Sequence, residues 1–182
     1  MVLLYGAPAV GKYTTGRRLS KITGFKFLHH HAIRDLVFQF FDFGRENLNG
    51  QKVWESLYFN FSEKIMREKI NVILTHTHAR NRVYATGLSS LKFVERIAKI
   101  VKRSGGIFYP VHLICEEKEL LKRVVQPSRK RYNKSNTVRE LTEMIKSRDY
   151  RTPLNVKNNF IINNTRISAK RTAKVIKDHF NL

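Results

Sequence analysis

Residues 6–15 of the chain read GAPAVGKYTT, with a lysine directly behind the second glycine. An apolar run at residues 2–5 precedes this stretch, and a segment with helical spacing at 16–22 follows it. Glycines let the backbone curl with its N–H groups pointing inward, and a helix N-terminus presents further unpaired N–H groups to an anion. The order strand, glycine-bounded loop, helix therefore predicts a phosphate-binding loop, where an ordinary turn is the alternative.

The spacing within this loop predicts which residues contact a nucleotide. Lys12 supplies a mobile cation for the β- and γ-phosphates, as in the G-x4-G-K pattern generally. That pattern continues with serine or threonine for magnesium, but Tyr13 stands there and the nearest hydroxyl is Thr14. We predict ATP and Mg²⁺ as cofactors, with Thr14 as the phosphate or magnesium ligand. The predicted loop contacts are Gly6, Ala9, Val10, Gly11, Lys12, Tyr13 and Thr14.

Length and composition predict a single globular domain over residues 1–182. The chain has 42% hydrophobic and 27% charged residues, which is typical of a folded protein. No apolar run approaches the roughly 20 residues that span a bilayer. The first predicted strand begins at residue 2 without a charged leader, and the single cysteine, Cys115, lies in an apolar run. These features favour a cytoplasmic protein without a membrane partner.

The charge of the chain is strongly positive. Thirty-five Lys and Arg residues against fourteen Asp and Glu give a net charge of +21. A basic surface attracts polyanions and phosphorylated ligands, so nucleic acid is a candidate partner. A general basic bias explains the same number equally well, because charge alone does not specify function.

Apolar periodicity predicts alternating strands and helices. After the loop and its helix, short apolar runs indicate strands at 25–28, 71–75, 107–115 and 159–163. Helical spacing lies between them, at 33–40, 51–69, 87–103, 116–125, 137–147 and 168–180. This alternation predicts an α/β protein with a parallel sheet, helices on both faces and ligands at the carboxyl ends of the strands.

Several short landmarks give the chain a family resemblance. They are the GAPAVGKxT loop, residues 28–31 with Asp35 behind them, Phe41-Asp42-Phe43-Gly44, Arg123 ahead of Pro127-Ser128-Arg129, and residues 162–165. On these the chain resembles P-loop small-molecule kinases such as adenylate and shikimate kinases, and more closely a poorly characterised bacterial family of AAA-type, shikimate-kinase-like proteins. The resemblance implies a three-layer P-loop NTPase fold with five strands in the order 2-3-1-4-5. It also implies a basic lid at residues 126–136.

The resemblance implies catalytic roles for basic residues. Lys12 is placed on the transferred phosphate, and Arg123 and Arg129 are placed in the lid that closes over it. Such cations neutralise charge on the equatorial oxygens and exclude water, which is most of what phosphoryl transfer requires. A solvated basic loop is the alternative, and Lys130 and Arg131 are weaker candidates. After the last strand, the resemblance places Asn164 and Arg166 near the adenine.

The acceptor site is expected near the ends of the second and third strands. His29 and His31, like His76 and His78, are two residues apart, so in extended chain each pair points the same way. Acceptor binding, metal binding and a mere strand-end position all remain open for these four. Asp35 is the candidate general base, with a solubility role as the alternative. No acidic residue follows the third strand between residues 71 and 80, where many P-loop proteins hold magnesium.

The predicted function is an ATP-dependent kinase that transfers the γ-phosphoryl group to a hydroxyl or phosphate of a small molecule or nucleotide. The basic charge keeps a kinase of nucleic-acid ends as an alternative. The missing acid keeps a second alternative, a nucleotide-binding regulatory protein without turnover.

Overall fold

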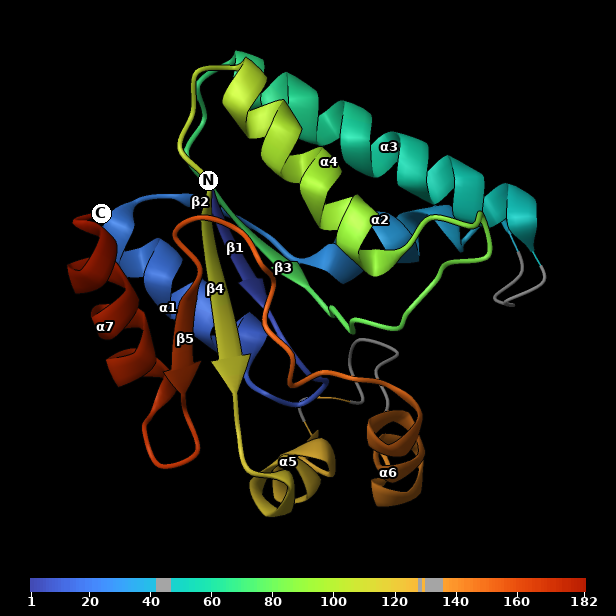
Figure 1. Cartoon of the computed structure of the whole chain (residues 1–182), viewed down its shortest axis with the longest axis vertical. Coiled ribbons are helices and arrows are strands. Elements are labelled where there is room, and N and C mark those ends of the chain that lie inside the picture. The colour runs from blue at the N-terminus through green and yellow to red at the C-terminus, as the bar shows by residue number, and fades with distance from the viewer. Residues whose placement is uncertain (42–46, 128, 130–135) are drawn as a thin grey trace.

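The computed structural model describes residues 1–41, 47–127, 129 and 136–182. Its centre is a sheet of parallel strands joined in the order β2-β3-β1-β4-β5 (Figure 1), which confirms the expected order. The strands are β1 (Val2–Tyr5), β2 (Lys26–Leu28), β3 (Val72–His76), β4 (Tyr109–Ile114) and β5 (Phe160–Asn163).

Helices cover both faces of the sheet, as expected for a parallel sheet. In Figure 1, α1 and α7 lie on one side, α2, α3 and α4 lie on the other, and α5 and α6 stand beyond the carboxyl ends of the strands. The helices are α1 (Lys12–Thr23), α2 (His30–Val37), α3 (Leu48–Arg67), α4 (Ser90–Arg103), α5 (Glu117–Val124), α6 (Val138–Ser147) and α7 (Ala169–Phe180).

The central strand β1 divides the core into two layers. Its side chains alternate between the faces of the sheet: Val2 and Leu4 belong to the apolar cluster that includes α1 and α7. Leu3 and Tyr5 belong to the cluster that includes α3 and α4. All four side chains are at most 1% exposed. The phosphate-loop stretch therefore leaves a fully buried central strand, which fixes where the loop begins.

The helix boundaries follow local capping chemistry. The α1 helix ends at Gly24, whose φ of 76° is the left-handed conformation that glycine adopts without strain. Hydroxyls of Ser89, Thr137 and Ser168 accept hydrogen bonds from backbone N–H groups at the starts of α4, α6 and α7. Thr137 thus caps the helix that the sequence predicted at 137–147.

One boundary differs from the expectation. The α2 helix begins at His30, three residues before the predicted start, so the histidine run does not extend β2. His29 caps the helix in an extended conformation, and His30 and His31 form its first turn. The apolar spacing that marked the helix begins only at Ile33, because the first turn consists mainly of histidines.

Two expected features lie partly outside the described residues. They are the landmark at 41–44, of which residues 42–44 are not described, and the basic lid at 126–136, of which residues 128 and 130–135 are not described. Ser128, Lys130 and Arg131 are among them. Among the described residues, no helix is both long enough and apolar enough to cross a bilayer.

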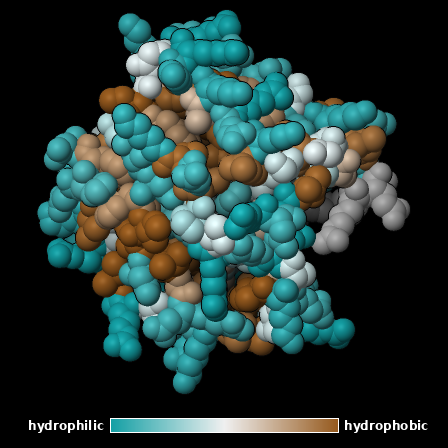
Figure 2. Space-filling view, in the orientation of Figure 1, coloured by the Kyte–Doolittle hydropathy of each residue, from teal (hydrophilic) through white to brown (hydrophobic). Residues whose placement is uncertain are grey.

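The outer surface reflects the charge of the chain. In Figure 2, hydrophilic side chains project along most of the outline of this face. Apolar residues show mainly where β5 lies in Figure 1, and Ile161 of that edge strand is 47% exposed.

Candidate functional site

The phosphate loop has the backbone conformation that its glycines predict. Gly6 has a φ of 134°, and Gly11 has a φ of 97°. A Cβ added at Gly6 would collide with the carbonyl oxygen of Leu113 on the adjacent strand β4. Only glycine fits there, because both the dihedral angle and the close approach exclude a side chain.

Lys12 is the first residue of α1 and lies over the loop. Its ammonium group donates hydrogen bonds to the carbonyl oxygens of Gly6, at 2.8 Å, and Ala7, at 2.6 Å. The side chain is only 9% exposed, so its charge is largely enclosed by the loop. An ammonium held this way beside a helix N-terminus is placed to bind phosphate oxygens.

The back of the loop is braced by two polar side chains. The carbonyl oxygen of Val10 accepts hydrogen bonds from the side-chain amide of Asn164, at 2.7 Å, and from Arg123, at 3.4 Å. Arg123 also donates to the Asn164 side chain, to the carbonyls of Asn164 and Thr165, and to Glu119. Asn164 is 3% exposed. These contacts join the loop, α5 and the end of β5.

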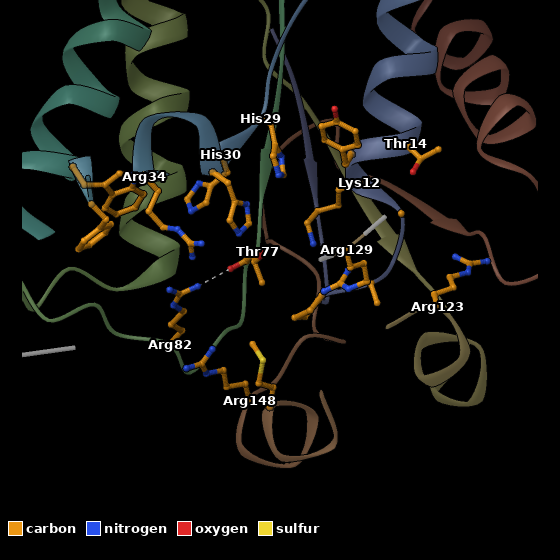
Figure 3. Close-up of a pocket in the computed structure, with 18 of the residues that line it drawn as sticks. Lys12, Thr14, His29, His30, Arg34, Thr77, Arg82, Arg123, Arg129 and Arg148 are labelled. Carbon is orange, nitrogen blue, oxygen red and sulfur yellow. Dashed lines mark hydrogen bonds between the residues drawn. The ribbon is translucent and has the colours of Figure 1, made fainter. Parts of the chain in front are cut away.

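A cavity of about 510 Å³ opens in front of the loop, at the carboxyl ends of the strands. Its described lining has one lysine and five arginines and no carboxylate. Figure 3 shows the charged groups converging from several elements. The lining residues are Pro8, Ala9, Gly11, Lys12, Tyr13, Thr14, His29, His30, His31, Arg34, Phe38, Gln51, Trp54, Thr77, Arg82, Tyr84, Arg123, Gln126, Arg129, Met144 and Arg148.

The end of the cavity away from Arg123 is formed by α2, the segment after β3 and the end of α6. His30, Arg34 and Phe38 follow one another at intervals of four residues, so they lie on one face of α2 and line the cavity together. Figure 3 shows Arg34 and Arg82 pointing toward one another beside His30. Arg82 donates to the carbonyl oxygen of Thr77 at 3.3 Å, and its guanidinium stacks 4.5 Å from the ring centre of Tyr84.

Asp35 does not line this cavity. Consecutive helical residues point about 100° apart, so the face that presents Arg34 turns Asp35 aside. Its carboxylate is 3.5 Å from the Arg34 guanidinium. The predicted role as general base stays a prediction, and this placement does not favour it.

The four predicted histidines separate into two pairs. His29 and His31 line the cavity with ring centres 4.7 Å apart, and the His29 imidazole contacts the Thr75 hydroxyl at 2.9 Å. His76 and His78 are 0% and 4% exposed and do not line it. Both contact the Ser90 hydroxyl, at 3.3 and 2.8 Å. The structure therefore corrects their expected place: α4 packs over the end of β3 and encloses them in the wall.

Burial keeps several of these imidazoles uncharged. Burial lowers the pKa of His30 well below the ordinary value of 6.5, and the positive charges of Arg82 and Arg34 lower it further. Burial lowers the pKa of His76 in the same way, and it lowers that of His78 to about 4. His30, His76 and His78 therefore add no positive charge to the site at neutral pH.

The other predicted nucleotide contacts differ in placement. Thr14 is exposed and lines the cavity. Arg129 also lines the cavity, and partial burial lowers the pKa of its guanidinium. Arg166 is exposed and does not line the cavity. Asn164 holds the Val10 carbonyl without lining the cavity, and Arg123 holds the same carbonyl and also lines the cavity. The predicted contacts of Asn164 and Arg166 with adenine, and of Thr14 with phosphate, stay predictions.

The donor groups of the cavity do not fit a magnesium site held by the protein. Mg²⁺ prefers carboxylate and water oxygens, whereas the described lining offers hydroxyls and two amides among six cations. At the position after Lys12, the Tyr13 ring packs edge-on against Phe27 and His29. Within the described ranges, no group of three or more His, Cys, Asp or Glu residues is arranged to hold a metal ion. Thr14 as a magnesium ligand stays a prediction.

Sequence reasoning missed part of the cavity wall. It did not select His30, Arg34, Thr77, Arg82 or Arg148, all of which line the cavity. The spacing from His30 to Arg34 within a short helix was the available signal. Arg82 and Arg148 lie outside the regular elements, where no periodicity indicates the direction of a side chain.

Comparisons with known proteins agree with this architecture. The AAA domain family matches residues 2–151. No curated protein matches the sequence. Among solved structures, a sugar kinase from Janibacter sp. HTCC2649 is similar with a TM-score of 0.67 at 11% identity, covering 99% of this chain and 93% of that chain. A gluconokinase from Sinorhizobium meliloti 1021 has a TM-score of 0.60 at 13% identity, with 98% and 91% covered. A shikimate kinase from Acinetobacter baumannii in complex with shikimate has a TM-score of 0.54 at 18% identity, with 99% and 92% covered.

Proposed function

The chain belongs to the AAA domain family and has the fold of P-loop small-molecule kinases, and on this basis we propose that it is an ATP-dependent kinase. It would transfer the γ-phosphoryl group to a hydroxyl or phosphate of a small molecule or nucleotide. The observation that carries the proposal is the continuous cavity that joins the Lys12 loop to an enclosed second end lined by α2. A nucleotide-binding switch needs the loop, whereas a kinase also needs space for an acceptor beside it.

In this proposal Lys12 exchanges its two loop carbonyls for oxygens of the β- and γ-phosphates. The N-terminus of α1 and the hydroxyl of Thr14 contact the same phosphates. Arg129, which lines the cavity, neutralises charge on the transferred group. Arg123 acts differently from the lid role expected for it, because its hydrogen bonds hold the carbonyl of Val10 and the end of β5. We propose that it positions the loop.

Transfer forms a bond from the acceptor oxygen to the γ-phosphorus and breaks the bond from that phosphorus to the β–γ bridging oxygen. ADP leaves, and the acceptor hydroxyl loses its proton. None of the described lining residues is a carboxylate, so the imidazoles of His29 and His31, which line the cavity, take this proton in the proposal. The histidines thereby take the role that the sequence assigned to Asp35.

The test is ATP binding by calorimetry together with product detection against nucleosides, nucleotides, sugars and sugar acids. Lys12→Ala should weaken ATP binding at least about tenfold, because it removes a charge-assisted contact to phosphate. Lys21→Ala is the matched control, since it removes the same charge from the exposed last turn of α1. A folded Lys12→Ala variant with unchanged ATP affinity would refute the phosphate-loop assignment.

The two alternatives predict different results in the same experiment. A nucleotide-binding protein without turnover, favoured by the absence of a carboxylate from the described lining, binds ATP and transfers phosphate to no acceptor. A kinase of nucleic-acid ends, suggested by the charge of +21, phosphorylates oligonucleotides with an affinity that falls steeply with salt.

A further inference from the structure

Three arginines surround the acceptor end of the cavity, and each comes from a different segment. Arg34 belongs to α2, Arg82 follows β3, and Arg148 follows α6 directly. Figure 3 places Arg34, Arg82 and Arg148 with His30 at this end, while Thr14 and Arg123 lie at the opposite end. Three separate segments thus bring their guanidinium groups to one end of the cavity.

The hydrogen bonds of Arg82 and Arg148 differ from those of Arg123, which has a structural role. The guanidinium of Arg123 donates to four protein oxygens besides its ion pair with Glu119, so its N–H donors are consumed by the fold. Within the described part of the chain, Arg82 donates one hydrogen bond, to the Thr77 carbonyl, and Arg148 donates one of 3.4 Å, to the Tyr150 hydroxyl. A guanidinium carries five N–H donors, so most of theirs remain for a ligand.

The local charge balance points the same way. Guanidinium groups that share a partly enclosed space repel one another, and no described lining residue carries a compensating negative charge. The carboxylate of Asp35 lies 3.5 Å from the Arg34 guanidinium, but Asp35 is outside the lining. A bound anion would remove this repulsion. Planar guanidinium forks match carboxylate and phosphate groups in particular, since both accept paired hydrogen bonds.

Two polar atoms in the same wall have no hydrogen-bond partner among the described residues. They are the indole nitrogen of Trp54, a residue 2% exposed, and Nδ1 of His30, a residue 7% exposed. Their rings meet edge-on with centres 5.2 Å apart. Buried polar groups are nearly always satisfied in folded proteins, so these two atoms are available to a ligand at this end of the cavity.

We propose that the acceptor is an anion, whose carboxylate or phosphate group is held by Arg82 and Arg148 with Arg34 beside them. The proposal rests on the kinase function, because it assigns the second substrate of that reaction. The anionic group anchors the acceptor at the end of the cavity remote from Arg123. The hydroxyl to be phosphorylated then points toward Lys12 and the γ-phosphate.

The experiment measures anion binding to the complex with ADP, which occupies the phosphate loop. Thermal unfolding is followed with saturating ADP while inorganic phosphate, citrate or the neutral sugar glucose is titrated, with sodium chloride matching the ionic strength. A ligand that binds only the folded state raises the unfolding midpoint in proportion to its saturation. We expect phosphate or citrate, and not glucose, to raise the midpoint beyond the salt control. The anion with the lower half-saturating concentration identifies the preferred group.

Arg82→Gln should raise that half-saturating concentration about tenfold to hundredfold, because it removes a charge-assisted contact. Arg82→Lys should recover only part of the loss, since it restores the charge without the fork. Arg80→Gln is the matched control, because it removes the same charge two residues away from an exposed side chain outside the lining. Unchanged ADP affinity in the Arg82 variants shows that their sites are folded.

The outcomes separate this inference from the proposed function. If ADP binds and neither anion exceeds the salt control, or if Arg82→Gln and Arg80→Gln respond alike, the anionic acceptor is refuted and the kinase function is untouched. If ADP fails to bind, the kinase function fails, and the anion titration is repeated without nucleotide on Lys12→Ala. An Arg82-dependent effect there still supports an anion site.

Discussion

His78→Gln tests how burial of histidine controls the stability of the cavity wall. His78 is 4% exposed, and burial, followed by the charge of His112, holds its pKa at about 4. In the unfolded chain the pKa returns to about 6.5, so a falling pH protonates the unfolded state first. The free energy of unfolding contributed by this neutral histidine is therefore complete above about pH 6.5 and is lost as the pH falls toward 4.

The size of this effect follows from the two pKa values. Between pH 7.5 and pH 5.5, His78 alone lowers the free energy of unfolding by about 1.4 kcal/mol, and the full loss near pH 3 is about 3.4 kcal/mol. His30 and His76 act in the same direction, because burial lowers their pKa values as well. The wild-type loss at pH 5.5 should therefore exceed 1.4 kcal/mol by a clear margin.

The assay is urea unfolding at pH 7.5 and pH 5.5. Glutamine retains a polar partner for the Ser90 hydroxyl but does not titrate, so His78→Gln should be less sensitive to this pH change by about 1.4 kcal/mol. His179→Gln on the exposed side of α7 is the control and should behave as wild type. An identical pH dependence in His78→Gln and wild type would refute the reasoning, whatever the absolute stabilities.

Three further predictions concern the loop and the proton acceptor. Gly6→Ala should destabilise the protein by about 3 kcal/mol or more, because a φ of 134° and the Leu113 carbonyl exclude a Cβ. Thermal unfolding measures this loss. Gly87→Ala is the control and should cost less, because the space around Gly87 is open. Asn164→Ala should lower the free energy of unfolding in urea by about 2–3 kcal/mol and weaken ATP binding, because it removes the shorter of the two hydrogen bonds to the Val10 carbonyl. An unchanged ATP affinity would contradict the bracing role. His31→Gln should lower kcat more than Asp35→Asn does, because only His31 lines the cavity, and a larger loss in Asp35→Asn would return the role of base to Asp35.

The sequence predicted the architecture because the strongest signals were local. The loop at 6–15, the buried strands and the capping residues each determine structure within a few positions, so β1, α1, α4, α6 and α7 lie close to where the patterns place them. The sheet order came from the resemblance and is confirmed. The cytoplasmic location stays a prediction.

The cavity was less accessible to such reasoning, because its walls depend on packing between distant segments. A polar first turn disguised the start of α2, so His30 and Arg34 were not recognised as one face. Burial of His76 and His78 depends on α4, which begins twelve residues after His78. Arg82 and Arg148 approach the cavity from irregular segments, and no periodic pattern relates two such positions.

The brace behind the phosphate loop has a consequence for where this protein can be cut. The matched family segment ends at residue 151, which would suggest that nucleotide binding needs nothing beyond it. Asn164 nevertheless holds the carbonyl of Val10, and Ile162, Ala173 and Ile176 fill the same core as Val2 and Leu4. A chain stopped at 151 would retain every signature residue of the loop but lose the edge strand and the helix packed on α1. The recognisable sequence unit is thus shorter than the unit that folds.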